Sequence, residues 1–250
     1  MNEAGPGATV EAQIYPERED TLLLLRFART RGTGWCVEVG CGTGAACREA
    51  ARHGWRAVGT DLNPQALASL QRAAGSEGLV VRPVRTDLLR GLGRFDLLLA
   101  NPPYLPTRPG ERDPDRWTNL ALDGGPDGLA TTRRIVRALP EHLAPGGRAF
   151  VVISSLSPAE RRRALAASWR RHGRVRVAAM RPLEGERLEV WEFALGPTSA
   201  SRRRPGPRRG TGTRRRARRA RPAASSRGTA SGGSRARGGA SGRRRSPPGS

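Results

Sequence analysis

The chain contains no lysine, and this absence changes how its large positive charge is interpreted. All 45 basic residues among the 250 are arginines, and the formal net charge is +23. Residues 1–200 carry 28 arginines and all 22 acidic residues, whereas residues 201–250 carry 17 arginines and no acidic residue. The excess charge therefore belongs to the carboxyl-terminal segment. An arginine-only composition rich in alanine and glycine is typical of a GC-rich coding sequence, so the charge alone does not indicate a nucleic-acid-binding core.

Cysteines are few, and long apolar runs are missing. Cys36, Cys41 and Cys47 form neither a C-x-x-C pair nor an even-numbered framework. They favour small buried thiols in a reduced compartment over a zinc or disulfide site. No run of about 18 apolar residues exists, and the amino terminus has no apolar signal core. These absences predict a soluble cytoplasmic enzyme or binding protein that holds no metal.

The first 195 residues alternate short apolar runs with helix-like segments. Strands are expected at 35–40, 56–61, 79–87, 95–100, 148–155, 175–180 and 188–195, and helices at 43–53, 64–74, 128–142 and 158–172. Pro64 and Pro158 suit first-turn positions, with Asn63 and Ser157 as caps. Several strands are apolar on both faces, as a covered parallel sheet requires. The pattern predicts an α/β, doubly wound, mostly parallel sheet. Because no long helix separates the last two strands, they are expected to form a terminal antiparallel hairpin.

The alternating pattern ends near residue 197. Residues 198–250 consist almost entirely of Arg, Gly, Ala, Ser and Pro. Such a composition cannot bury enough apolar surface to offset chain entropy, so a disordered tail is predicted after a domain at 1–197. The tail either binds RNA or another polyanion weakly through phosphate contacts, or is an extension produced by read-through or a shifted frame. The sequence leaves both interpretations open.

A glycine-rich turn follows the first expected strand. Segment 38–44 reads E-x-G-x-G-x-G, formed by Glu38, Gly40, Gly42 and Gly44. Glycines let the backbone approach a ligand, and a helix amino terminus offers free N–H groups. Asp61 ends the next apolar run, 17 residues after Gly44, where a carboxylate can accept hydrogen bonds from two ribose hydroxyls. This arrangement suits a dinucleotide or S-adenosylmethionine (SAM).

Two further carboxylates have competing interpretations. Asp87 follows the third expected strand, where it can accept from an adenine amino group or cap a turn. Glu38 is either a solvated charge at a strand end or part of an acidic mouth. SAM carries a sulfonium and an ammonium group, so an acidic mouth favours SAM over a cofactor with a pyrophosphate.

The segment NPPY at 101–104 ends an apolar strand with two prolines. Proline lacks the N–H that a central strand needs, so the chain must leave the sheet at Asn101, where open α/β sheets bind ligands. The Asn101 side-chain oxygen and the Pro102 carbonyl can both accept from one NH₂ group and orient its nitrogen. Pro103 stiffens the turn, and Tyr104 can pack on a planar substrate. The alternative is a proline-rich loop without chemistry.

The glycine loop, Asp61, Asp87 and NPPY together resemble the Rossmann-like class I SAM-dependent methyltransferases that modify planar nitrogens of adenine, guanine or glutamine. Four segments, IYPEREDTLLLL (14–25), ALDGGPDGL (121–129), SSLS (154–157) and PLEGERLEVWEF (182–193), are similar to segments of the short HemK-like methyltransferases of archaea and eukaryotes. The resemblance covers about residues 10–195. It does not include the long amino-terminal helical domain of bacterial HemK.

The resemblance implies N5-methylation of the glutamine in the Gly-Gly-Gln loop of a class-one translation release factor. Some relatives also need a small zinc-binding activator subunit, and such a partner is an open expectation. The candidate catalytic residues are Asn101, Pro102, Pro103 and Tyr104. The candidate cofactor-binding residues are Tyr15, Thr21, Glu38, Gly40, Gly42, Gly44, Asp61, Asp87 and Asn101, with Glu19 and Asp20 near the cofactor mouth. Arg18 makes its segment more basic than is typical of the family, and Trp117 is expected only to pack within its loop.

Two alternatives remain at this point. The first is a DNA or RNA methyltransferase acting on adenine or guanine, which the basic tail encourages but which the absence of a separate target-recognition segment disfavours. The second is an RNA-associated binding protein with an inactive methyltransferase core. In that case SAM would not bind, and RNA affinity would fall steeply with salt and disappear on removal of residues 198–250.

Overall fold

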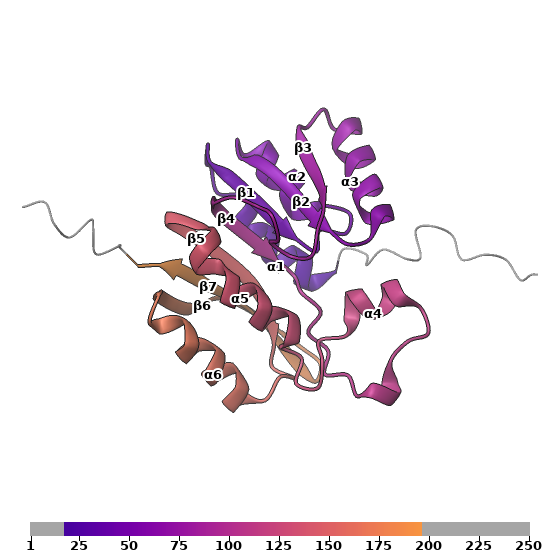
Figure 1. Cartoon of the computed structure of the whole chain (residues 1–250), viewed down its shortest axis with the longest axis vertical. Coiled ribbons are helices and arrows are strands. Elements are labelled where there is room, and N and C mark those ends of the chain that lie inside the picture. The colour runs from indigo at the N-terminus through magenta and orange to yellow at the C-terminus, as the bar shows by residue number, and fades with distance from the viewer. Residues whose placement is uncertain (1–17, 197–250) are drawn as a thin grey trace, which may run out of the picture. The chain divides into compact units, whose positions relative to one another are not determined.

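Residues 18–196 are described in a computed structural model of the protein (Figure 1). The strands are β1 (Trp35–Val39), β2 (Arg56–Asp61), β3 (Val81–Arg85), β4 (Phe95–Ala100), β5 (Leu143–Ser154), β6 (Gly173–Leu183) and β7 (Glu186–Leu195). The helices are α1 (Glu19–Ala28), α2 (Ala45–Arg52), α3 (Pro64–Ser76), α4 (Arg116–Leu122), α5 (Ala130–His142) and α6 (Ala159–Arg170), with a 3-10 turn at Pro109–Glu111. The predicted tail and Tyr15 lie outside the described residues.

The strands form one seven-stranded sheet in the order β3-β2-β1-β4-β5-β7-β6. Neighbours from β3 to β5 pair in parallel, whereas β7 runs antiparallel to both β5 and β6. The predicted doubly wound sheet with a terminal antiparallel hairpin is therefore confirmed. The chain winds outward from β1 in one direction and from β4 in the other. This reversal opens a crevice at the carboxyl ends of β1 and β4.

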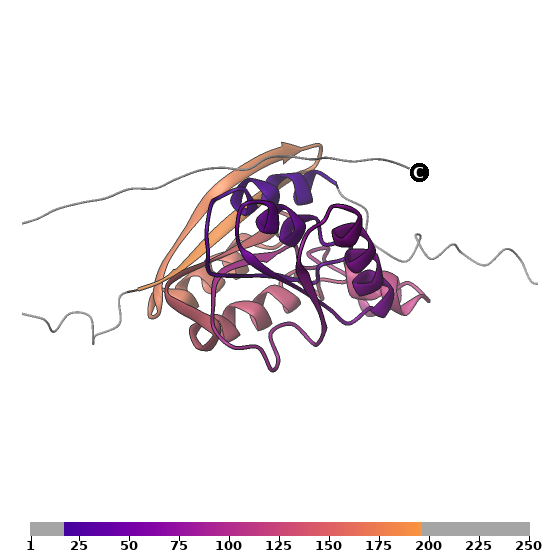
Figure 2. The same cartoon turned by 90° about the horizontal axis from the view of Figure 1, so that it is seen from above.

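Both faces of the sheet are covered, because successive residues of its central strands alternate between two apolar clusters. Val37 and Leu98 belong to the cluster that includes α5 and α6. Cys36 and Leu97 belong to the cluster that includes α1 and α2. Figures 1 and 2 show α5 and α6 on one face of the sheet and α1 and α2 on the other. The two-sided burial explains why these strands read as continuous apolar runs.

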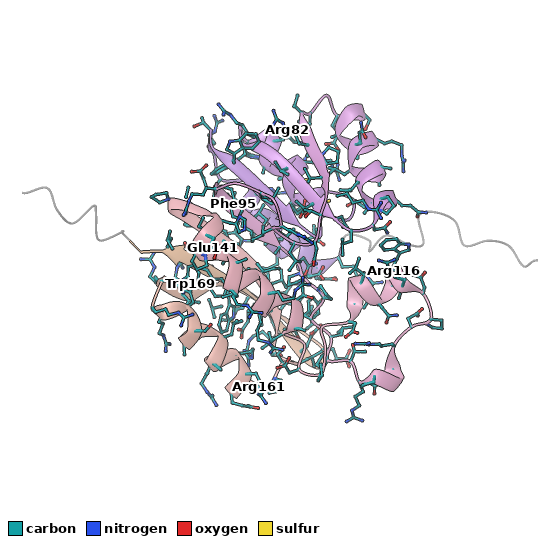
Figure 3. All side chains as sticks on the ribbon, in the orientation of Figure 1. Arg82, Phe95, Arg116, Glu141, Arg161 and Trp169 are labelled. Atoms are coloured by element: carbon teal, nitrogen blue, oxygen red, sulfur yellow. The ribbon has the colours of Figure 1, made fainter. Side chains whose placement is uncertain are left out.

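Trp169 anchors α6 to the sheet, as its position in Figure 3 shows. The side chain is 1% exposed and meets the ring of Phe193 edge to face, with centroids 5.6 Å apart. Its indole N–H donates to the carbonyl of Arg174 at 3.1 Å, so the buried polar atom is satisfied.

One of the two predicted helix caps is present. Asn63 caps α3, because its side-chain oxygen accepts from the Gln65 amide at 2.9 Å. The prediction for Ser157 is wrong, since Pro158 occupies the cap position of α6 and the Ser157 hydroxyl is buried without a hydrogen-bond partner in the described part of the chain. Tertiary packing explains the difference: Ser157 lies against Gly128, where an added Cβ would come within 2.9 Å of the hydroxyl oxygen.

The sequence pattern missed two helices. The leucines of α1 are contiguous, so they show no helical spacing, but Leu23, Leu24 and Leu25 all become buried. Helix α4 spans seven residues and none of them is buried. Its start is fixed by the Asp115 carboxylate, which accepts from the Thr118 amide at 2.7 Å. In addition, β5 begins at Leu143, five residues before the predicted strand.

The three cysteines are buried and unpaired, which confirms the predicted small buried thiols. Burial raises the pKa of all three thiols well above the ordinary value. Within residues 18–196, none of the helices has the length and apolar character needed to span a membrane.

Candidate functional site

A cavity of about 570 Å³ lies at the crevice and is lined by the residues that follow β1, β2 and β4, with contributions from α1, α4 and the start of β7. Its lining includes most of the predicted site residues: Asp20, Thr21, Glu38, Gly40, Gly42, Asp61, Asp87 and 101–104. Glu19 and Gly44 do not line it. The fold thus gathers at one place segments that are far apart in the sequence.

The glycine loop needs its glycines for conformation and for space. Gly40, Gly42 and Gly44 all have positive φ, at 63°, 51° and 76°. Gly44 is the N-cap of α2, and a Cβ there would lie 2.2 Å from a methyl carbon of Leu70. At Gly40 an added Cβ would meet no atom within 4 Å, so open space lies beside that backbone. The loop therefore exposes its main chain to the cavity at Gly40 and packs tightly against α3 at Gly44.

Glu38 is buried, 6% exposed, and the interpretation of a solvated strand-end charge is wrong. Its two carboxylate oxygens accept from the amides of Ala46, at 3.3 Å, and Cys47, at 2.8 Å. These amides belong to the first turn of α2, where free N–H groups favour a negative charge. Burial nevertheless raises the pKa of Glu38 to about 7, against the opposing effect of those hydrogen bonds. Glu38 therefore joins β1 to α2 beneath the loop.

Asp61 connects the glycine loop to the turn after β2. One carboxylate oxygen accepts from the Gly42 amide at 3.1 Å, and the other accepts from the Asn63 amide at 2.8 Å. A carboxylate offers about four acceptor positions. Asp61 can therefore hold this backbone and still accept hydroxyl hydrogens from a ligand in the cavity.

Asp87 makes an ion pair that the sequence did not indicate. Its carboxylate accepts from the Arg134 guanidinium of α5 at 2.5 Å, and both residues line the cavity. Leu88, the next residue, has φ 54° and is the one described non-glycine residue with a positive φ. Backbone strain of this kind is found preferentially at functional sites. The turn places the side chains of Asp87 and Leu88 at the end of the cavity beside β3 and α5.

The NPPY turn contains one hydrogen-bond acceptor without a partner among the described residues, the Asn101 side-chain oxygen, and one hydroxyl held by a hydrogen bond, that of Tyr104. The Asn101 side-chain oxygen is buried and has no hydrogen-bond partner within the described residues. The Tyr104 hydroxyl donates to Asp20 at 2.9 Å, across 84 positions of sequence. Asp20 is 1% exposed and also accepts from the Thr21 amide at 2.7 Å. Tyr104 is thus held against α1, while the Asn101 oxygen remains available to a ligand.

Comparison with known proteins identifies the family of this chain. A family model for a methyltransferase domain matches residues 37–102. A protein of Methanocaldococcus jannaschii, provisionally named a protein N5-glutamine methyltransferase, is 35% identical over 147 residues, which cover 58% of this chain and 74% of that one. The mouse methyltransferase HEMK2 is 38% identical over 152 residues, which cover 56% of this chain and 71% of that one. This chain belongs to the HemK-like glutamine methyltransferases.

A solved structure supports the fold of this HemK-like protein. A chain of the E. cuniculi Mtq2-Trm112 complex, which is responsible for methylation of the eRF1 translation termination factor, superposes with a TM-score of 0.56 at 23% identity. The match covers 74% of this chain and 99% of that chain. This match supports a Rossmann-like sheet, and the family model and the two relatives show a SAM-dependent methyltransferase.

Some cavity residues of the HemK-like enzyme were not predicted for the site from the sequence. Trp117 lines the cavity, so its assignment to simple loop packing is incomplete. Glu186 also lines the cavity. It lies within the hairpin segment 182–193, which was recognised by resemblance and could have suggested it.

The cavity lining carries more acidic than basic side chains. It contains five carboxylates, those of Asp20, Glu38, Asp61, Asp87 and Glu186, but only two guanidiniums, those of Arg18 and Arg134. The mouth is acidic and suits a cationic ligand.

Proposed function

We propose that this enzyme methylates the side-chain nitrogen of glutamine in the Gly-Gly-Gln loop of a class-one translation release factor. The observation that carries the proposal is the buried, unpartnered side-chain oxygen of Asn101 at the cavity. An unsatisfied buried acceptor costs about 1–3 kcal/mol, so such an atom is expected to meet a donor on a bound ligand. The names of the M. jannaschii relative and of the E. cuniculi complex support glutamine and a termination factor as the acceptor class.

The cofactor half of the cavity has features that fit SAM. The backbone beside Gly40 faces open space, Gly42 and Asp61 form a fixed loop, and the lining is acidic. We assign SAM binding to Gly40, Gly42, Asp61 and Asp87, with Glu38 supporting the loop and Thr21 at the mouth. Gly44 acts behind the loop as the start of α2. When bound, SAM supplies a methyl group on a cationic sulfonium.

The acceptor half needs to orient a weak nucleophile. The nitrogen of a carboxamide has a delocalised lone pair, so its position and the surrounding charges matter more than a strong base. The Asn101 side-chain oxygen and the Pro102 carbonyl would accept the two hydrogens of the amide and fix the direction of its nitrogen. Pro103 and the Tyr104–Asp20 hydrogen bond hold the turn in place. In the net reaction the nitrogen would take the methyl group as the sulfur–methyl bond breaks, the sulfonium would become a neutral thioether, and one amide proton would pass to solvent.

The acidic lining favours a polypeptide acceptor over a nucleic acid. Arg134 pairs with Asp87, and Arg18 and Arg134 are the two arginines in a lining that contains five carboxylates. A nucleic-acid enzyme would have to bring phosphates to this negative mouth, whereas phosphate binding normally relies on basic residues. The adenine or guanine methyltransferase is therefore the less supported candidate.

A small activator subunit, expected to bind zinc, is a further part of the proposal. The E. cuniculi neighbour was solved as a complex of two proteins. In the present chain β3 is an edge strand, and Val80 beside it is 82% exposed. Sheet edges of this kind can pair with another chain. Added activator should raise the rate of methyl transfer, and unchanged rates would remove this element of the proposal.

The decisive experiment supplies the full chain with tritiated SAM and offers a release factor, total RNA and duplex DNA in parallel. Mass spectrometry then locates the label. A methyl group on the Gly-Gly-Gln glutamine is the expected result, whereas label in RNA or DNA would replace the proposal with the nucleic-acid alternative. Repeating the assay with a chain ending at residue 197 tests the proposed domain boundary and whether residues 198–250 contribute.

A further inference from the structure

Helix α4 is held by polar bonds of its own segment rather than by the core. Asp115 accepts from the backbone amide of Thr118 at 2.7 Å and from its hydroxyl at 3.0 Å. The Asn119 side-chain amide donates to the carbonyls of Asp113 and Asp115. No residue of the helix is buried, and Figure 1 shows α4 standing apart from the helices that cover the sheet. Its apolar side chains therefore have little packing role within the domain.

The base of this segment is fastened to the NPPY turn. Leu105 and Asp123 form a β-bridge, and the Gly124 amide donates to the Leu105 carbonyl at 2.9 Å. Gly128 has φ 70°, and a Cβ there would lie 2.3 Å from the Tyr104 carbonyl oxygen. This close approach leaves no room for a side chain. The position of α4 relative to the proposed methyl-acceptor site is thus defined.

The apolar side chains of α4 face the same cavity as Asn101. Trp117 and Leu120 line it, together with Leu105 from the end of the NPPY turn. Leu120 is 39% exposed and Leu105 is 37% exposed. The Arg116 guanidinium, labelled in Figure 3, lies 5.0 Å from the centre of the Trp117 ring. Apolar surface grouped at the mouth of a functional cavity indicates a ligand that covers it.

We infer that Trp117, Leu120 and Leu105 form an apolar wall that binds the acceptor polypeptide beside its reacting glutamine, and thereby determine acceptor specificity. The inference rests on the proposed function and adds the surface that recognises the substrate. The wall lines the same cavity as Asn101, and Leu105 directly follows the NPPY turn, so residues flanking the glutamine can lie on it while the amide reaches Asn101. Glycines beside the glutamine would allow main chain to lie directly on the indole ring.

Glu186 gives this half of the cavity a polar contact suited to main chain. One of its carboxylate oxygens accepts from the Ser154 hydroxyl at 2.6 Å, which fixes the side chain where β5 ends and β7 begins. β5 is the neighbour of β4, whose end carries Asn101. A fixed carboxylate there can accept a main-chain N–H of the acceptor and repels a phosphodiester. Apolar wall and carboxylate together favour a polypeptide.

The test compares Trp117→Ala, Trp117→Phe and Leu120→Ala in the full chain, with an intact release factor as acceptor. Trp117→Ala should raise the acceptor KM about tenfold, as loss of an aromatic anchor commonly does. Its kcat at saturating acceptor and its Kd for SAM should stay within about twofold, because the inference assigns Trp117 to residues flanking the glutamine rather than to the reacting amide or the cofactor. Leu120→Ala should raise KM less, and Trp117→Phe should restore most of the loss. The matched control is Met180→Ala, since Met180 is 58% exposed on β6 and does not line the cavity.

The outcomes separate the two proposals. An unchanged acceptor KM in Trp117→Ala, with normal glutamine methylation by the wild type, removes the inference and leaves the proposed function standing. A parallel loss of SAM affinity would assign α4 to the cofactor and also overturn it. If the wild type labels no glutamine, the proposed function fails and the inference fails with it. Thermal unfolding of each variant should match the wild type, because α4 has no buried residue, and Leu120→Ala provides an independent reading of the same wall.

Discussion

The parts of the cavity proposed to bind the cofactor and the acceptor are built in different ways. In the cofactor half, Glu38 and Asp61 already accept hydrogen bonds from backbone amides of the loop that they support. In the acceptor half, the Asn101 oxygen has no partner among the described residues, and α4 buries none of its side chains. The proposed cofactor half is thus organised in advance, whereas the proposed acceptor half keeps one unpaired polar atom, the Asn101 oxygen, and apolar side chains of α4 that are not buried.

This difference corresponds to two kinds of ligand. A cofactor of constant structure can be matched by a loop that the core makes rigid, with its polar groups already oriented. An acceptor that arrives on another protein must supply the missing hydrogen-bond donors and cover the apolar wall. Variants in the two halves should therefore separate cofactor binding from acceptor binding.

The largest effect is expected for Asn101→Ala. Removal of an acceptor that orients the reacting amide should lower kcat about 10²–10³-fold. The Kd for SAM should change by less than about twofold, because the assigned cofactor contacts are elsewhere. Calorimetry with SAM and single-turnover labelling measure the two quantities separately. Wild-type labelling rates in Asn101→Ala would remove the distinction between the two halves.

Asp61→Ala should instead weaken cofactor binding together with activity. It removes a charged acceptor and releases the Gly42 and Asn63 amides. Charged hydrogen bonds contribute about 1.5–3 kcal/mol each, so the Kd for SAM should rise at least about tenfold. Asp61→Asn serves as the control. It keeps one acceptor oxygen, so its Kd for SAM should lie between those of the wild type and Asp61→Ala. Normal SAM affinity in Asp61→Ala would contradict the assigned cofactor half.

The raised pKa of Glu38 predicts that cofactor binding depends on pH. Its pKa is raised to about 7 by burial, so the folded protein takes up a proton as pH falls through that value. If the cationic cofactor prefers the ionised form, its affinity should increase about tenfold between about pH 6 and 8. Glu38→Gln should flatten this profile, as titration calorimetry across the range would show. A steep profile that persists in Glu38→Gln would assign the titration to another group.

The same raised pKa predicts that the free energy of unfolding falls as pH rises, whereas the affinity for the cofactor increases. A carboxyl group whose folded pKa exceeds its unfolded value stabilises the fold at pH below the unfolded pKa, and this contribution is lost as pH rises through about 7. Bound cofactor should offset part of the loss.

The smallest effect is expected for Tyr104→Phe. The change removes the hydrogen bond to Asp20 but keeps the ring, and should lower the free energy of unfolding by about 1–2 kcal/mol. The turn would be held less firmly, so kcat should fall a few-fold while SAM affinity is retained. Urea unfolding and steady-state kinetics measure both. A loss as large as that of Asn101→Ala would instead place the phenol in direct contact with the reacting amide.

Much of the cofactor half could be predicted from local patterns. The apolar run ending at Val39, the glycine spacing after it and Asp61 at the next strand end follow from the periodicity of strands and the conformational freedom of glycine. Val39, Gly40, Gly42 and Asp61 line the cavity, whereas Gly44 does not. The burial of Glu38 was not predicted. The local sequence is the same whether a carboxylate at a strand end is exposed to water or accepts hydrogen bonds from the amides of a helix's first turn.

The acceptor half depends on contacts between distant segments. Tyr104 meets Asp20 across 84 positions, and Glu186 reaches the cavity only because β7 folds back beside β5. Helix α4 has too few residues for a clear periodic pattern and is stabilised by its Asp115 cap. Because the helix was not recognised from the sequence, the position of Trp117 at the cavity was not predicted.

The sequence by itself determined the parallel sheet, the glycine loop and the NPPY turn, because each depends on backbone preferences of residues close together in the chain. Only the tertiary structure decided that Glu186 joins the predicted carboxylates at the cavity, which hydroxyl holds the turn and where the apolar side chains of α4 point. Those outcomes depend on how strands and helices pack, and packing brings together residues whose separation in the sequence carries no local signal.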